Sequence, residues 1–348
     1  MLEKYIKRNS AIELLRIMCI WMIILYHLSM HSYGEALEHN VLWDIVTNVF
    51  HIGVVCFILI SGWFGIKASI SGGVKLIIPC LFYSIIIRCF DVFILDSPLT
   101  IKDVFATLTP IMHEEWWFMT SYIILYILSP FANLLWEGIT EKQRKMLIIS
   151  LGIIMLYFGC LGHISTINGG RDIITFLFIY YLGRLLRNKR MYIEKKSLIM
   201  MYSSVVICIF VGACIKETFP FISLIISLMC FGYNSPGLII MAVSVFMYFA
   251  TMRPFYNKWI NYSASSVFSV YLLHENYVTY PFMRNLLHVG LDDYSMLIVF
   301  CILSTILVAI LIIFDKFSLI LYMPIANRTE AFIQNFIKKH DIFTKSGT

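Results

Sequence analysis

The chain has 348 residues, of which 59% are hydrophobic and only 14% are charged, and its mean hydropathy is +0.81. Soluble domains carry about 25% charged residues, so this composition excludes an ordinary soluble enzyme and predicts a polytopic membrane protein. The net charge of +6 is accounted for by basic residues in predicted loops, and it does not indicate a nucleic-acid partner.

The first apolar segment covers residues 11–30. At about 1.5 Å per residue it spans the roughly 30 Å of a hydrocarbon core. Arg16 and His27 are eleven positions apart, which brings the helical angle back to within about 20°, so both side chains share one face with Glu13. Arginine at membrane depth usually faces a bundle interior or a watered cavity, which predicts a functional site. The alternative is a structural Glu13–Arg16 pair with an interfacial histidine.

Further apolar segments complete the prediction of an all-α bundle with ten spans. They cover residues 44–64, 74–95, 117–136, 146–163, 173–186, 198–215, 237–252, 264–282 and 296–322.

The apolar stretch 219–231 is too short to cross and is expected to be re-entrant or interfacial. With this topology most loop Lys and Arg lie on the side of the N-terminus, which predicts that both termini are cytoplasmic. The predicted organisation is a transmembrane domain over 1–323 followed by a short basic cytoplasmic tail over 324–348.

Several polar side chains fall within the other predicted spans. Arg88 and Asp91 are three positions apart and are expected to neutralise one another. His274 and Glu275 lie about ten residues into their span, which favours a position on a cavity wall. Consecutive helical residues point about 100° apart, so Glu275 is expected to serve a histidine of another helix and not His274.

The start of the fourth span combines an acid with aromatic residues: Glu115, Trp116 and Trp117, followed by Tyr122. The aromatic residues fit an interfacial belt, and the same set also suits a carbohydrate site outside the membrane. The residues alone leave both readings open. The nine cysteines all lie in apolar segments without metal-ligand spacing, so no metal site and no disulfide framework are predicted.

Residues 13–27, 57–67, 116–133 and 265–276 together resemble the acyltransferase-3 family of integral membrane acyltransferases. The first of these stretches carries the family's pattern of an arginine, ten residues and a histidine. The resemblance implies a multi-pass protein of the bacterial cytoplasmic membrane. Its expected activity is transfer of an acyl group, with acetyl expected, from cytoplasmic acyl-CoA to a hydroxyl of a surface glycan such as exopolysaccharide, capsule or O-antigen. No permanently bound cofactor is implied.

The resemblance makes His27 and Arg16 the central functional residues. Arg16 is expected to bind the donor together with Lys67 and Lys75, which stand where many members carry arginines; lysine keeps the charge but lacks the bidentate fork. Combined with the residue chemistry above, the expected wall of the substrate cavity consists of Glu13, Ser61, Glu115, Trp116, Trp117, Tyr122, His274 and Glu275.

Two other classes of protein fit the residues without the resemblance. A transporter or flippase for a polysaccharide intermediate would explain ten spans with intramembrane charge, although such proteins more often show internal repeats and broken helices at mid-depth. A polysaccharide polymerase would be expected to concentrate Arg and His in a large outer loop, whereas the predicted outer loops are short and poor in basic residues.

Overall fold

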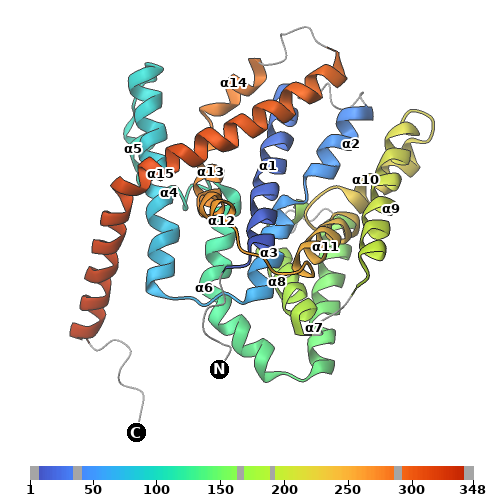
Figure 1. Ribbon diagram of the computed structural model, residues 1–348, viewed down its shortest axis with the longest axis horizontal. Coiled ribbons are helices and arrows are strands. Elements are labelled where there is room, and N and C mark those ends of the chain that lie inside the picture. The colour runs from blue at the N-terminus through green and yellow to red at the C-terminus, as the bar shows by residue number, and fades with distance from the viewer. Residues whose placement is uncertain (1–7, 34–40, 163–167, 189–192, 286–291, 341–348) are drawn as a thin grey trace.

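The structure, a computed structural model, describes residues 8–33, 41–162, 168–188, 193–285 and 292–340 (Figure 1). These ranges form helices and connecting turns and contain no strand. The helices are α1 (Ser10–Tyr33), α2 (Val41–Phe50), α3 (Gly53–Phe64), α4 (Ile70–Ile94), α5 (Ile101–Leu108), α6 (Trp117–Gly138), α7 (Glu141–Ile154), η2 (Met155–Leu161), η3 (Asn168–Gly170), α8 (Ile173–Asn188), α9 (Lys195–Cys214), α10 (Pro220–Cys230), α11 (Pro236–Ala250), α12 (Lys258–Ala264), α13 (Val267–His274), α14 (Thr279–Asn285) and α15 (Asp293–His340).

Within the described ranges, seven helical segments are long and apolar enough to cross a membrane. All ten predicted spans are helical, but three of them are not among these seven segments. Helix α8 has 16 residues, α11 has 15, and the expected span over 264–282 is divided among α12, α13 and α14. The all-α membrane fold is therefore confirmed, while the number of spans and the side of the termini stay predictions.

The structure agrees with the sequence-based prediction at α10 and differs from it at the end of α15. Helix α10 has 11 residues, about 16 Å of rise, which is too short to span and agrees with the prediction that 219–231 does not cross. Helix α15 does not stop near residue 322 but continues to His340, for 48 residues in all, with Pro324 inside it. Figure 1 shows a sharp bend along α15, and proline is the usual cause of such a bend.

Helix α1 forms the centre of the bundle. It packs against α2, α3, α11, α12, α13, α14 and α15, and its Leu15, Ile20, Ile24 and Leu25 are fully buried. By contrast, α15 exposes a row of large apolar side chains that includes Ile306 and Ile313. Hydrocarbon is the solvent that such a row requires, so α1 supplies the interior while α15 presents a face for lipid.

Next to α1, two other helices of the bundle are held in close contact. Helices α3 and α8 make the most extensive contact in the bundle, and two glycines allow it. A Cβ added at Gly62 would collide with the backbone oxygen of Tyr180, and one at Gly183 would lie 2.6 Å from that of Leu59. Small residues at membrane helix crossings let backbones approach in this way, which holds Ser61 beside α1.

The predicted ninth span is broken after His274, and Asn276 holds the break in place. Its side-chain amide donates to Leu273 O at 2.7 Å, while its oxygen accepts from Val278 N at 3.1 Å and Thr279 N at 3.3 Å. This arrangement caps the start of α14 in the manner of a helix N-cap. The expectation of a continuous helix was wrong because local side-chain hydrogen bonds replace the helical ladder at this point.

Candidate active site

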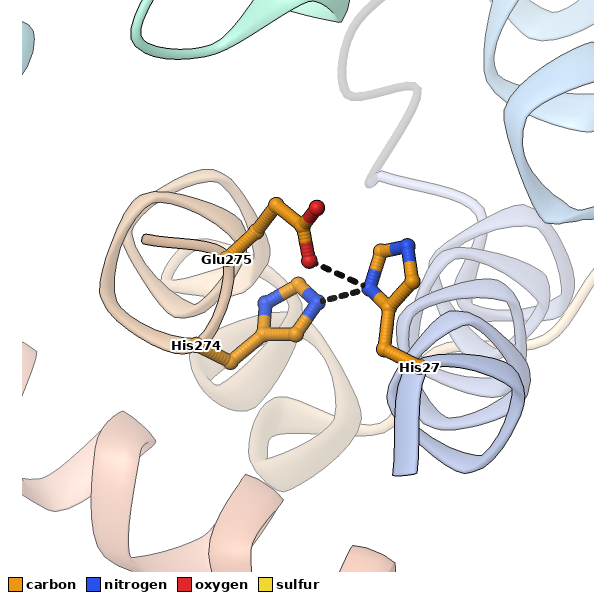
Figure 2. Close-up of side chains that lie close together, drawn as sticks. All are labelled: His27, His274 and Glu275. Carbon is orange, nitrogen blue, oxygen red and sulfur yellow. Dashed lines mark hydrogen bonds and ion pairs between the residues drawn. The ribbon is translucent and has the colours of Figure 1, made fainter. Parts of the chain in front are cut away.

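Three ionisable side chains from two distant parts of the chain meet near the upper end of α1 (Figure 2). His27 Nδ1 lies 2.7 Å from Glu275 Oε2 and 3.0 Å from His274 Nε2. His274 is 1% exposed, and the side chains of His27 and Glu275 are 14% and 12% exposed. Glu275 thus contacts a histidine of another helix, as the sequence predicted. We call His27, His274 and Glu275 the triad.

Hydrogen bonding assigns the protons of the triad. His274 Nδ1 lies 3.0 Å from the carbonyl oxygen of Val270, and a carbonyl can only accept, so His274 Nδ1 carries the hydrogen. In neutral His274 the other nitrogen, Nε2, is then an acceptor. His27 Nδ1 must therefore carry the hydrogen, which it donates to His274 Nε2 at 3.0 Å. The Glu275 carboxylate lies against the same nitrogen at 2.7 Å, and its Oε2 accepts no hydrogen bond from the described residues. This leaves the lone pair of neutral His27 on Nε2.

The surroundings of His27 orient its ring. Figure 2 shows that Nδ1 faces both partners while Nε2 lies on the opposite side of the ring. Glu275 is held in turn by Tyr280, whose hydroxyl donates to Oε1 at 3.0 Å. A histidine that donates its Nδ1 hydrogen to a fixed neighbour, lies beside a carboxylate and keeps its lone pair on Nε2 is arranged to accept a proton from a hydroxyl. The triad can therefore act as a general base.

Arg16 lies lower on α1, in a different environment. It lines a cavity of about 330 Å³, here called the Arg16 cavity. Most of the wall is apolar, and its residues are Arg8, Arg16, Ile23, Val54, Phe57, Ser61, Leu76, Phe118, Met119, Tyr122, Ala264, Ser265, Val267, Phe268 and Tyr271. The predicted residues Arg16, Ser61 and Tyr122 are thus brought together. Such a wall suits a partly apolar ligand that carries an anionic group.

Two local contacts shape the polar part of the Arg16 cavity. Ser61 Oγ donates to Phe57 O at 3.0 Å and lies 3.1 Å from Tyr122 Oη, so Tyr122 is the donor in that second bond. Glu13 is 4% exposed and lies 3.7 Å from Arg16 and 2.7 Å from Arg8. The structural pairing of Glu13 with Arg16 is therefore present, and Arg16 still faces the cavity.

The cavity and the triad adjoin along α1 and α13. Ile23, in the cavity wall, precedes His27 by one helical turn. Tyr271, also in the wall, has its ring centroid 5.9 Å from that of His274. The top of the Arg16 cavity is thus one side chain away from the triad. His27 itself is not part of the cavity lining.

The two predicted tryptophans are packed elsewhere. Trp116 is 2% exposed, and its Nε1 donates to Leu272 O at 3.1 Å, so it ties the start of α6 to α13. Trp117 lies against Tyr233 at 5.1 Å between ring centroids and beneath the guanidinium of Arg171 at 5.1 Å. Neither lines the Arg16 cavity.

The remaining predicted residues occupy other places. Glu115 accepts a hydrogen bond from Ser84 at 2.8 Å and lines a separate cavity. Burial raises the pKa of Glu115, against the opposing effects of Ser84 and Arg88. Lys75 lines a third cavity, of about 180 Å³. Lys67 is exposed and lines none of these three.

Sequence reasoning gave no role to three residues that the structure places at the site. Tyr280 holds Glu275, Asn276 fixes the helix break, and Arg8 shares Glu13 with Arg16. Asn276 carried a signal, since it ends the stretch 265–276 that contains His274 and Glu275. Tyr280 and Arg8 carried none, because their partners Glu275 and Glu13 lie five positions away along the chain, outside the i, i+3 and i, i+4 spacings that pair side chains on a helix.

The triad also has the donor types of a metal site. Its ligand atoms lie within 4.8 Å of one another, and a second histidine nitrogen bound to a carbonyl is a common support for a metal ligand. However, two ligands of a tetrahedral zinc lie about 3.3 Å apart, given bonds of about 2.0–2.1 Å. The 2.7 Å ion-pair contact and the 3.0 Å hydrogen bond are shorter than that spacing, which favours the triad as it stands.

Comparison with known proteins adds a family to this geometry. No curated protein and no solved structure matched the chain. A family model described as an acyltransferase domain matches residues 9–314, a range that includes the triad, the helix break and every residue of the Arg16 cavity except Arg8. Because the match covers nearly the whole chain, this membrane protein belongs to the acyltransferase-3 family.

Proposed function

We propose that the protein transfers an acyl group, with acetyl as the expected case, from acyl-CoA to a hydroxyl of a surface glycan. The observation that carries this proposal is the triad: a carboxylate and a second histidine both face Nδ1 of His27. That arrangement supplies a general base inside a membrane bundle of an acyltransferase family. The proposed membrane is the bacterial cytoplasmic membrane, with acyl-CoA arriving from the side of the N-terminus.

The proposed reaction uses His27 Nε2 as the base. An acceptor hydroxyl gives its proton to Nε2 while its oxygen attacks the thioester carbonyl of the donor. The carbon–sulfur bond then breaks, and the imidazolium returns the proton to the leaving thiolate. Glu275 stabilises the imidazolium between these steps, since hydrogen bonds to charged groups contribute about 1.5–3 kcal/mol.

Arg16 and the Arg16 cavity are proposed to receive the donor. The eleven positions from Arg16 to His27 correspond to a rise of about 16 Å, so an extended donor can bind at Arg16 through an anionic group and place its thioester beside the triad. The apolar wall of the cavity suits the arm between those two ends. This division of labour explains why both residues lie on one face of α1.

The test compares wild-type protein with His27→Ala in purified, bilayer-reconstituted form. Transfer of labelled acetyl from acetyl-CoA to surface polysaccharide should fall by about 10²–10⁴-fold, the usual contribution of general base catalysis. An exposed histidine at the end of α15 provides the matched control, His340→Gln, which should transfer at the wild-type rate. Wild-type transfer by His27→Ala at normal protein abundance would remove His27 from the mechanism.

A further inference from the structure

A second cavity lies beside the triad, between α4, α5 and the break before α14. We call it the α5 cavity; its volume is about 190 Å³, and it is lined by Ser84, Arg88, Ala106, Thr107, His113, Glu115 and Tyr277. Figure 1 shows α5 and α14 at the end of the bundle where α1 finishes. The cavity thus belongs to the same end as the triad.

The α5 cavity differs from the Arg16 cavity in size and in the types of residue that line it. Six of its seven lining residues have polar side chains, and only Ala106 is apolar, whereas the Arg16 cavity is lined mainly by aliphatic and aromatic residues. Its volume is below the roughly 300–1,000 Å³ typical of sites for drug-sized ligands. Most of the surface that these side chains turn to the cavity is carbon, with a few polar groups among it. This combination of size and surface suits one small ring that carries hydroxyl groups better than a long acyl donor.

The polar groups of the α5 cavity are held in fixed positions. Arg88 donates to Asp91 at 2.9 Å and to Thr107 at 3.2 Å, and its guanidinium lies 4.9 Å from the ring centroid of Tyr277. Tyr277 donates its hydroxyl to Asp91 at 3.2 Å. These bonds leave the cavity with donors and acceptors that need little reorganisation on binding.

Glu115 supplies the main acceptor of the α5 cavity. Its Oε2 accepts from Ser84 at 2.8 Å, while Oε1 has no hydrogen-bond partner among the described residues. The guanidinium of Arg88 and the carboxyl group of Glu115 both line the cavity, but Arg88 is already paired with Asp91 at 2.9 Å and Asp103 at 3.8 Å. An anionic ligand would therefore meet a cation that is already neutralised, which favours an uncharged ligand over an anionic one.

The α5 cavity is connected to the triad through the broken helix. Tyr277 follows Glu275 by two residues, so their Cα atoms lie within about 7 Å of one another. Asn276, between them, is 3% exposed and is held by the hydrogen bonds of the break. A ligand held by Tyr277 and Glu115 is therefore placed close to the element that orients His27.

We infer that the α5 cavity binds one uncharged sugar ring of the acceptor glycan, next to the residue that is acylated. This inference rests on the proposed function, which it deepens by naming the acceptor class and its subsite. The carboxyl group of Glu115 and the guanidinium of Arg88 are held in fixed positions and can form hydrogen bonds with neighbouring hydroxyl groups of the sugar. Tyr277 provides an aromatic surface for the sugar ring.

The test fills the cavity without touching its polar groups. Ala106→Leu adds volume at the one apolar position, and leucine keeps helix propensity in α5. The matched control is Val104→Leu, at an exposed position of α5 outside the cavity. Binding of methyl glucoside and methyl glucuronide to reconstituted full-length protein is measured by saturation-transfer NMR, and acyl transfer is measured in parallel.

We expect wild-type protein and Val104→Leu to bind the neutral glycoside, and Ala106→Leu to lose at least tenfold in affinity. Glu115→Gln should also weaken binding of the neutral glycoside, whereas Glu114→Gln, at the exposed neighbouring position, should not. Unchanged binding and acceptor KM in Ala106→Leu would overturn the inference, as would a preference for the glucuronide. A different outcome is that the wild-type protein binds the neutral glycoside and Ala106→Leu does not, while the wild-type protein has no transferase activity. That result would overturn the proposed function and leave the sugar site in place.

Discussion

The two ends of α1 solve the problem of polar groups inside a membrane in different ways. At the lower end, Arg16 is accompanied by Glu13, one turn away on the same helix, at 3.7 Å. At the upper end, His27 meets Glu275 and His274, which lie 247 and more residues away along the chain. A partner on the same helix stabilises the charge of Arg16 as soon as that helix forms. Partners from a distant part of the chain fix the protonated nitrogen of His27 only when the bundle has folded.

This difference indicates separate tasks for the two residues. A locally paired arginine beside an open, mainly apolar cavity keeps hydrogen-bond donors for a ligand. A histidine fixed at Nδ1 by remote partners gains a defined tautomer and a fixed ring, which chemistry needs more than binding does. We therefore expect variants at the upper end to lower kcat and variants at the lower end to raise the KM for acyl-CoA.

Glu275→Gln should have the largest effect among variants that keep the shape of the site. The amide removes the charge that stabilises the imidazolium of His27, and a loss of about 1.5–3 kcal/mol corresponds to a fall in kcat of about 10–100-fold. The KM for acyl-CoA should stay near the wild-type value. A change in KM with unchanged kcat would contradict the separation of tasks, and steady-state kinetics with both substrates varied provides the measurement.

Arg16→Lys should act on the donor side. Lysine keeps the positive charge but loses the bidentate fork, so the KM for acyl-CoA should rise by about tenfold with a smaller change in kcat. Isothermal titration of reconstituted protein with coenzyme A measures the same loss without turnover. If donor affinity is unchanged while kcat falls, Arg16 belongs to the chemical step and the comparison fails.

The predicted donor lysines allow the smallest and most selective test. Lys75 lines a cavity that shares Ser265 and Phe268 with the Arg16 cavity, whereas Lys67 is exposed and lines neither. Lys75→Ala should raise the KM for acyl-CoA by about two- to fivefold, as expected for an exposed charge worth up to about 1 kcal/mol. Lys67→Ala should leave it unchanged. Equal effects of the two changes would mean that the donor is bound outside these cavities.

The sequence predicted the membrane class and the common face of Arg16 and His27 because both depend on local properties. Apolar runs of about 20 residues must be helical in lipid, and the helical repeat places residues eleven apart on one side. It also predicted that Glu275 serves a histidine of another helix. The break at Asn276 was missed because apolar content continues through it, and a hydrophobicity pattern does not register a side chain that replaces a backbone hydrogen bond.

Of the predicted cavity residues, the sequence could not say which would share a cavity. Arg16, Ser61 and Tyr122 line one, Glu115 lines another, and Trp116 is packed against α13. These residues lie on different helices, and their meeting depends on crossings such as the glycine contact between α3 and α8. Aromatic and carboxylate residues at the start of α6 form the same sequence pattern whether they pack inside the bundle or bind a ligand.

By itself the sequence determined an all-helical membrane protein with a cation and a histidine along one ridge of its first helix, since helical repeat and hydropathy are carried by neighbouring residues. Only the tertiary structure decided that Nδ1 of His27 faces Glu275 and His274, that the helix carrying them is broken by Asn276, and that Glu115 lines a separate polar cavity. Those features depend on contacts between segments more than 150 residues apart or on competition between side-chain and backbone hydrogen bonds, and neither is written in the local pattern.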